Sequence, residues 1–256
     1  MKYAIGKSSA VFIGEDSAIK VFNLRKKSIK PARGSYELCW LRETTCLERL
    51  KGKLHFPQLL ESYDDDHLGL RMTTVGESLF DTWPEHNLQS YVDQAHTIAD
   101  TLEATNIQYF YPGMDPNSKS KEYVKFPLSN FCIQDGELSL IDFELANPVG
   151  SKAQEGISER LKSLYDNYNK DHFRQALVNA LTNPRECYES ELLAKLVDKD
   201  KFQDLKKLIP REVWKTMTAF TKPSDKIINE WKKYQKRYGM DDAINRVERM
   251  QFSKVI

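Results

Sequence analysis

The chain has 256 residues, with 38 Lys and Arg against 37 Asp and Glu, so its formal net charge is +1. Hydrophobic residues make up 40% and charged residues 29%, the composition of a globular protein with enough chain to bury a core. This charge balance argues against a dedicated nucleic-acid-binding protein, which needs a strong positive field. The four cysteines, Cys39, Cys46, Cys132 and Cys187, form no CxxC pair, which argues against a zinc site or a disulfide framework.

The beginning of the chain lacks the charged-then-apolar layout of a signal peptide. No apolar run reaches the length needed to span a bilayer, so we expect no transmembrane segment. Together with the cysteine usage, these features predict a cytoplasmic protein, or an effector that is exported without a classical signal peptide.

The first third of the chain predicts strands with one inserted helix. Two β-type runs, 3–12 and 17–22, flank the turn residues 14–16, which indicates a hairpin. Apolar residues then recur at helical spacing between Ser35, a candidate N-cap, and Gly52, a glycine where a helix commonly ends. Two further strands are expected at 59–63 and 68–73, around an acidic turn.

After Val75 the pattern becomes mainly helical. The clearest amphipathic helix covers 88–102, where apolar residues recur in steps of three and four. A polar stretch rich in Pro, Gly, Ser and Lys, 109–126, has the length of a functional or mobile loop. Two short strands, 131–134 and 138–141, follow it, and the rest of the chain is predicted to be helical. The expected fold class is therefore α+β.

Two polar residues frame the second hairpin. Asn130 precedes its first strand and Asp142 follows its second strand, so both side chains can converge on one side of the ribbon. Two such oxygen ligands could hold Mg²⁺ on a triphosphate. The simpler interpretation of an Asp after a strand is a cap or turn residue.

The order NFCIQDGELSLIDFE, residues 130–144, resembles the metal-binding stretch of the protein-kinase-like superfamily, with DFE in place of DFG. The resemblance extends over about residues 5 to 147 and implies a bilobal fold. Residues 1–75 would form a small antiparallel-sheet N-lobe with one helix. Residues 76–256 would form a larger, mainly helical C-lobe, with the catalytic and metal-binding segment at 109–147. ATP and Mg²⁺ are the implied cofactors, with Asn130 and Asp142 as the metal ligands.

The same resemblance assigns roles upstream. Lys20, in the strand-like run AIKVF, matches the lysine that contacts the α- and β-phosphates. Glu43 matches the helical glutamate that pairs with that lysine, and Glu37 is the alternative.

Two further segments match nucleotide-contacting parts of the family. The hairpin that carries Gly6, Ser8 and Ser9 would cover the phosphates, although it has one glycine where the family usually has three. Residues 72–79 resemble the hinge between the lobes, with Met72 lining the adenine pocket and Thr74 beside it.

The chain departs from the family at the catalytic aspartate, which orients the attacking hydroxyl and stands five residues before the metal-binding asparagine. Here that position is Lys125. Asp115 could serve instead if the residues after it are an insertion, although an Asp-Pro turn is its simpler interpretation. Alternatively, Lys125 could stabilise charge on the γ-phosphate. Glu144 in place of the DFG glycine is more similar to the small-molecule, sugar or lipopolysaccharide kinases of the superfamily.

Three hypotheses follow. The first is an ATP-dependent phosphotransferase that moves the γ-phosphate of ATP to a hydroxyl acceptor, which could be a protein, a sugar, a lipid or a small molecule. The alternative is a pseudokinase that acts as a nucleotide-binding or protein-interaction module. The third is nucleic-acid binding through the aromatic and basic residues of 231–238, for which a helix with an aromatic inner face is the simpler interpretation.

Overall fold

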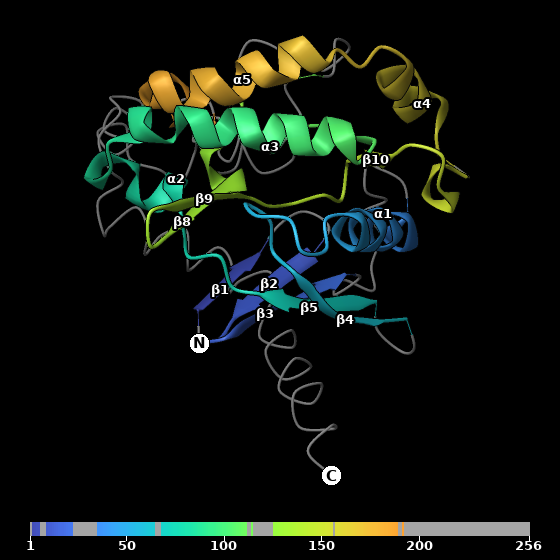
Figure 1. The fold of residues 1–256 in the computed structure, drawn as a ribbon. Helices are drawn as coiled ribbons and strands as arrows, with labels where there is room; N and C mark the ends of the chain where they lie inside the picture. Colours follow the sequence, from blue (N-terminus) through green and yellow to red (C-terminus); the bar gives the residue numbers. More distant parts are fainter. Residues whose placement is uncertain are drawn as a thin grey trace, which may run out of the picture.

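The computed structural model describes residues 2–5, 9–22, 35–64, 68–111, 114, 125–155, 157–188 and 191. Its first part is a five-stranded antiparallel sheet in the order β1-β2-β3-β5-β4, drawn at the bottom of Figure 1. The strands are β1 (Lys2–Ile5), β2 (Ser9–Ile13), β3 (Ser17–Phe22), β4 (Leu59–Tyr63) and β5 (Gly69–Thr73).

The predicted hairpin around Gly14 is confirmed. β2 pairs with β3 from Ile13 opposite Ala18 onward, and Gly14 N donates to Ser17 O at 2.9 Å. The run 3–12, however, is not one strand, because β1 and β2 pair with each other in antiparallel fashion, with Ile5 opposite Ala10. Alternation of side chains is the same for one long strand and for two strands joined by a short connection, so the pattern alone does not separate them.

One helix, α1 (Tyr36–Arg49), packs on this sheet, as the sequence predicts. The Ser35 hydroxyl caps its first turn by accepting from Leu38 N at 3.3 Å. Gly52 follows the end of the helix with a φ of +73°, a conformation that favours glycine. The Trp40 indole donates to Gly69 O at 3.0 Å and ties the helix to β5.

The chain leaves the five-stranded sheet after Thr73 and enters a second, three-stranded sheet of order β6-β8-β9. These strands are β6 (Glu77–Ser78), β8 (Phe131–Gln134) and β9 (Glu137–Leu140). Gly76, at the crossing, has a φ of +89°, and a Cβ atom there would lie 2.0 Å from Ile133 O. Only glycine allows this close approach of the two backbones.

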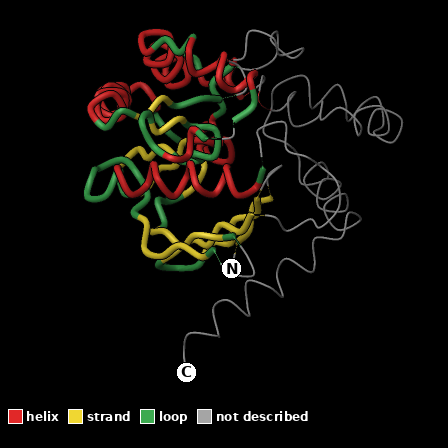
Figure 2. Tube along the Cα trace, turned by 90° about the vertical axis from the view of Figure 1, so that its right-hand side faces the viewer, coloured by secondary structure: helices red, strands yellow, loops and turns green. Residues whose placement is uncertain are grey.

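The remaining helices are α2 (Leu79–Thr82), α3 (Val92–Ala104), α4 (Glu159–Asp166) and α5 (Lys170–Thr182). Figures 1 and 2 show α3 and α5 on the side of the β8–β9 ribbon that is remote from the five-stranded sheet. The predicted helix 88–102 begins later than expected, because residues 88–91 form a 3-10 turn before α3. Ala95, Ile98 and Leu102 are buried on the expected face.

A short two-stranded ladder lies beside these helices. It pairs β7 (Ile107–Gln108) with β10 (Asn147–Pro148), and it packs against α1 and α3. No helix in the described part of the chain is long and apolar enough to cross a bilayer. Most of the predicted loop 109–126 and the basic, aromatic stretch 231–238 lie outside the described residues.

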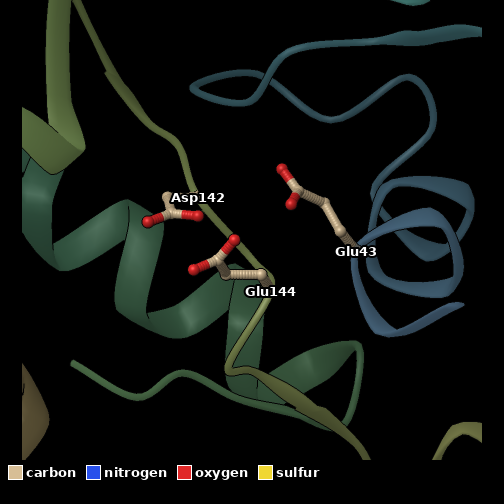
Figure 3. Close-up of side chains that lie close together, drawn as sticks. All are labelled: Glu43, Asp142 and Glu144. Atoms are coloured by element: carbon tan, nitrogen blue, oxygen red, sulfur yellow. The ribbon is translucent and has the colours of Figure 1, made fainter. Parts of the chain in front are cut away.

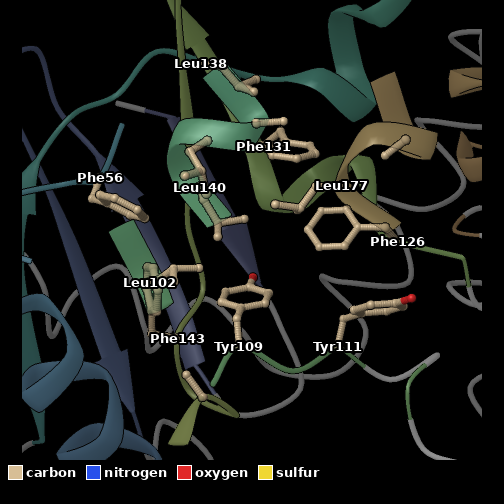
Figure 4. Close-up of a cluster of buried hydrophobic side chains, with 14 of the residues drawn as sticks. Phe56, Leu102, Tyr109, Tyr111, Phe126, Phe131, Leu138, Leu140, Phe143 and Leu177 are labelled. Carbon is tan, nitrogen blue, oxygen red and sulfur yellow. The ribbon is translucent and has the colours of Figure 1, made fainter. Parts of the chain in front are cut away.

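A single hydrophobic cluster connects the two parts of the molecule (Figure 4). Phe143, just after β9, contacts Phe56 on the sheet side at a ring distance of 6.1 Å. The same ring meets Tyr109 edge-on at 5.3 Å, and Tyr109 packs on Phe173 of α5 at 5.5 Å. The structure is thus a mixed helix and sheet fold with a small antiparallel sheet, as expected for the α+β class.

Candidate functional site

Lys20 lies in the middle of β3, where it is paired with Val11 of β2 and Leu70 of β5. Apolar neighbours surround its strand, and the whole residue is only 4% exposed. The ammonium lies 5.4 Å from the ring centre of Phe22. A lysine so deeply buried needs charged partners, because desolvation of an ammonium is costly.

Those partners come from two distant segments. Lys20 Nζ donates to Glu43 Oε2 at 2.6 Å and to Asp142 Oδ1 at 2.8 Å. Glu144 Oε2 lies 3.8 Å from the same nitrogen. Figure 3 shows the three carboxylates directed toward one space, Glu43 from α1 and the other two from the segment after β9.

Glu43 sits on the buried face of α1, and its side chain is 2% exposed. The alternative glutamate, Glu37, lies in the exposed first turn of the same helix. The structure therefore brings Glu43, and not Glu37, to the lysine.

Asp142 follows β9 directly and has a φ of +69°, in the left-handed region that Asp tolerates better than most residues. Its side chain is 36% exposed, whereas those of Lys20 and Glu144 are 5% and 6% exposed. The cluster is thus closed on the sheet side and open to solvent at Asp142.

Among the described residues, three carboxylates surround one ammonium, so these four side chains together carry more negative than positive charge. Burial lowers the pKa of Lys20, but the charges of Asp142 and the two glutamates outweigh it and hold this pKa above its ordinary value. Burial raises the pKa of Glu43 to about 7, against the opposing effect of Lys20. A cation that entered the cluster would offset this excess of negative charge.

Asn130 is held beside Asp142 by backbone and side-chain hydrogen bonds. Its carbonyl accepts from Ile141 N at 2.9 Å, which fixes it next to the residue before Asp142. Its amide Nδ2 donates to the Tyr109 hydroxyl at 2.8 Å, and that hydroxyl donates to Ile141 O at 2.6 Å. Tyr109 therefore fixes both the side chain of Asn130 and the backbone that leads into Asp142.

The sequence does not single out Tyr109, which is one aromatic residue among several. The residue is fully buried, and burial together with the charge of Asp142 raises its pKa well above the ordinary value. Its hydroxyl consequently stays protonated and able to donate. Glu144, noted in the sequence as a departure from the family, is also a close neighbour of Lys20.

The oxygen groups of this site suit a hard divalent cation. Asn130 and Asp142 are the predicted ligands, and amide and carboxylate oxygens are the donors that Mg²⁺ prefers. Oxygen atoms of Glu43, Asp142 and Glu144 also lie within 4.8 Å of one another. Asp142 and Asn130 would hold the ion, with Glu144 close enough to add to the negative field.

Lys125, the candidate charge stabiliser, lies in a more exposed setting than Lys20 does. Lys125 is 60% exposed, and its ammonium lies 3.5 Å from Glu186 Oε2. Asp115 lies outside the described residues. The choice between these two residues therefore stays a prediction.

Three of the residues predicted to contact the nucleotide, Ser9, Met72 and Thr74, lie in or next to the five-stranded sheet. Ser9 lies in β2 opposite Phe22, and Gly6 and Ser8 lie outside the described residues. Met72 is buried in β5 opposite Ala18. Thr74 follows β5, half-buried, and its hydroxyl donates to Glu15 O at 3.3 Å.

A separate cavity of about 470 Å³ shares no lining residue with the Lys20 cluster. Its walls come from β7, β10, α4 and the residues between β10 and α4, including Gln108, Asn147, Lys162 and Tyr165. Hydrogen bonds between side-chain amides fix one wall of this cavity. Asn147 Nδ2 donates to Gln108 Oε1, and Gln154 Nε2 donates to Asn147 Oδ1.

No protein-family model matches the sequence, and no curated protein is similar to it. Among solved structures, a crystal structure of WbdD is 17% identical, with a TM-score of 0.43, over 58% of this chain and 33% of that chain. WbdD bound to a kinase inhibitor gives 18% identity and a TM-score of 0.41, with the same coverage. A third structure, of the bifunctional kinase-methyltransferase WbdD, gives 18% and 0.41 over 55% of this chain and 30% of that chain. The match thus spans about a third of the WbdD chains. A likeness this partial assigns no role to any residue of the site, and the description of the site depends only on its own contacts.

Proposed function

We propose that this protein is an ATP-dependent phosphotransferase that moves the γ-phosphate of ATP to a hydroxyl acceptor. The observation that supports the proposal most directly is the contact of Lys20 with both Glu43 and Asp142. An ammonium has three N–H donors, and these contacts use two of them. The third can bind a phosphate oxygen while the lysine stays oriented by its carboxylate partners.

The proposed roles follow from this arrangement. Lys20 binds the α- and β-phosphates, and Glu43 orients it. Asn130 and Asp142 hold Mg²⁺, which when bound neutralises charge on the phosphate oxygens. The open side of the cluster at Asp142 leaves that carboxylate accessible to the ion and its nucleotide.

The nucleotide would extend along the sheet from this point. Gly6, Ser8 and Ser9 cover the phosphates, and Met72 and Thr74 contact the adenine. In this proposal residues 1–75 form the N-lobe and 76–256 the C-lobe of a bilobal protein-kinase-like fold. The chain changes from one sheet to the other between Thr73 and Glu77, which supports a boundary near Val75.

In the transfer step an acceptor oxygen attacks the γ-phosphorus while the bond from that phosphorus to the β–γ bridging oxygen breaks. ADP leaves, and the acceptor proton passes to a base or to solvent. Lys20 stabilises the charge that develops on the departing diphosphate. Asp115 is the candidate base, and Lys125 is the alternative as a charge stabiliser.

A pseudokinase is the second candidate function, and one observation favours it. Lys125 stands where the superfamily has its catalytic aspartate, and it is exposed and ion-paired with Glu186. Such a protein would bind nucleotide without transferring phosphate and act as a binding or interaction module.

The two functions separate in one experiment with Mg²⁺ and γ-labelled ATP, in which the melting temperature and phosphate release or autophosphorylation are measured. The phosphotransferase predicts a raised melting temperature and labelled product, with the product lost in Asp142→Ala. A raised melting temperature without product would favour the pseudokinase over the phosphotransferase. If neither appears, and oligonucleotides bind with a steep salt dependence instead, both candidates are wrong.

A further inference from the structure

We propose that Tyr165 is a positioning residue that sets the separation between Glu43 and Glu144, and so the orientation of Lys20. This inference rests on the proposed function for its effect on turnover. Its structural part concerns two hydrogen bonds of one hydroxyl group and can be tested without any nucleotide.

The Tyr165 hydroxyl touches both sides of the cluster. It accepts from Arg42 Nη1 at 3.0 Å and donates to Leu145 O at 3.2 Å. Arg42 directly precedes Glu43 on α1, and Leu145 directly follows Glu144. One hydroxyl therefore joins the immediate chain neighbours of two carboxylates that surround Lys20.

Arg42 is a well-anchored part of this connection because its guanidinium is buried and hydrogen-bonded. The residue is 0% exposed. Its Nε donates to Leu38 O at 2.9 Å and its Nη2 lies 3.8 Å from Cys39 Sγ, so the side chain is held against its own helix. When a buried guanidinium loses a hydrogen bond, the unpaired donor is destabilised by its full desolvation free energy. The side chain is therefore most stable in the one position that keeps its hydrogen bonds.

Tyr165 is equally well fixed from the α4 side. Its ring packs on Phe110 at 5.0 Å, within a small cluster that includes Leu161. Burial raises the pKa of Tyr165, although Arg42 opposes this, so the hydroxyl keeps the proton that it donates to Leu145.

Other contacts hold α1 without reaching the Asp142–Glu144 segment. Trp40 ties the helix to the sheet, and Arg49 donates to the carbonyls of Asn106 and Val149 near the end of the helix. The Tyr165 hydroxyl links the middle of α1, where Glu43 is found, to that segment. Its loss leaves the distance between Glu43 and Glu144 less constrained and the Lys20 ammonium less well oriented.

Tyr165→Phe removes the hydroxyl and keeps the ring in its cluster. The matched control is Tyr188→Phe, which removes another buried hydroxyl that has no hydrogen-bond partner among the described residues. If the interaction of one buried hydrogen-bonding group is lost in the transition state, the rate constant falls about tenfold. We expect kcat to fall about tenfold in Tyr165→Phe, with KM for ATP changed less than about threefold, and the control to match wild type.

A double-mutant cycle with Glu43→Gln tests whether Tyr165 acts through Glu43. If it does, adding Tyr165→Phe to Glu43→Gln lowers kcat by much less than it does in wild type. If kcat of the double mutant falls by the product of the two single-mutant factors, the proposal is wrong.

Thermal unfolding of the same four proteins keeps the test independent of the proposed function. This test holds even if wild type shows no turnover, so that the proposed function fails. If the melting-temperature shift of the double mutant is smaller than the sum of the two single-mutant shifts, Tyr165 is coupled to Glu43. Fully additive shifts contradict it.

Discussion

Lys20 Nζ and Asp142 Oδ1 lie 2.8 Å apart although the two residues are 122 positions apart in the sequence. The ammonium comes from the central strand of the five-stranded sheet, and the carboxylate follows the last strand of the second sheet. The Lys20 side chain is 5% exposed and that of Asp142 is 36% exposed, so a ligand would reach the pair from the Asp142 side.

We expect Asp142→Asn to lower phosphate transfer by about 100-fold or more, because it removes the negative charge that would hold Mg²⁺ against the phosphates. The control is Asp135→Asn, the same chemical change in the exposed turn of the same hairpin, where Asn also tolerates the φ of +52°. Turnover with labelled ATP measures both. Equal turnover in the two variants would show that Asp142 is not a ligand.

The raised pKa of Glu43 gives a pH-dependent stability. Between its unfolded value of 4.5 and its folded value of about 7, the folded protein holds more protons than the unfolded chain at this site. Stability from this group therefore falls as the pH rises through that window. Lys20, Asp142 and Glu144 are the charged groups that face it.

The measurement is the melting temperature of metal-free protein from pH 4.5 to 7.5. The melting temperature of Glu43→Gln should fall less with rising pH than that of wild type. Glu48→Gln, on the exposed face of the same helix, should keep the wild-type slope. Identical slopes in wild type and Glu43→Gln would contradict the assignment.

Tyr109→Phe should both destabilise the fold and weaken metal binding. The change leaves Asn130 Nδ2 and the Ile141 carbonyl without their hydroxyl partner, a cost of about 1–3 kcal/mol. Urea unfolding measures the first effect, and the Mg²⁺ concentration for half-maximal turnover, which should rise, measures the second. Tyr111→Phe is the control, since the structure gives its hydroxyl no hydrogen bond to a described residue. An unchanged Mg²⁺ dependence in Tyr109→Phe would mean that Tyr109 does not position Asn130.

Gly76→Ala tests the close approach of the Gly76 backbone to β8. Its Cβ would lie 2.0 Å from Ile133 O, so β6 and β8 must separate, at a cost of about 3 kcal/mol or more. Gly136→Ala is matched for backbone strain, with a φ of +82° and no atom within 4 Å of the added Cβ, and should cost about 1–2 kcal/mol. Equal free energies of unfolding for the two variants would show that the contact with Ile133 relaxes freely.

Local signals in the sequence predicted the local structure well. Ser35 and Gly52 mark the limits of α1 because capping depends on residues within one helical turn. The strand 59–63 and the β8–β9 hairpin follow from alternation and turn residues in the same way. The start of α3 was predicted too early, because a 3-10 turn and an α-helix share nearly the same apolar spacing.

Contacts between distant segments were predictable only where a motif marked them. The AIKVF run and the DFE motif singled out Lys20 and Asp142, which the structure brings together. Nothing in the sequence marks Tyr109 or Tyr165, because an aromatic residue in an apolar run predicts burial and not the partner of its hydroxyl. Those partners depend on how the segments pack.

The decisive experiment for the Lys20–Asp142 site is calorimetric titration with a non-hydrolysable ATP analogue, with and without Mg²⁺. We compare wild type with Lys20→Met, which keeps an unbranched side chain in β3 and removes the ammonium. Wild type should bind the analogue in a Mg²⁺-dependent manner, and Lys20→Met should bind at least about tenfold more weakly. Absence of binding to folded wild type, or equal affinity in the two proteins, would contradict a nucleotide site built around Lys20 and Asp142.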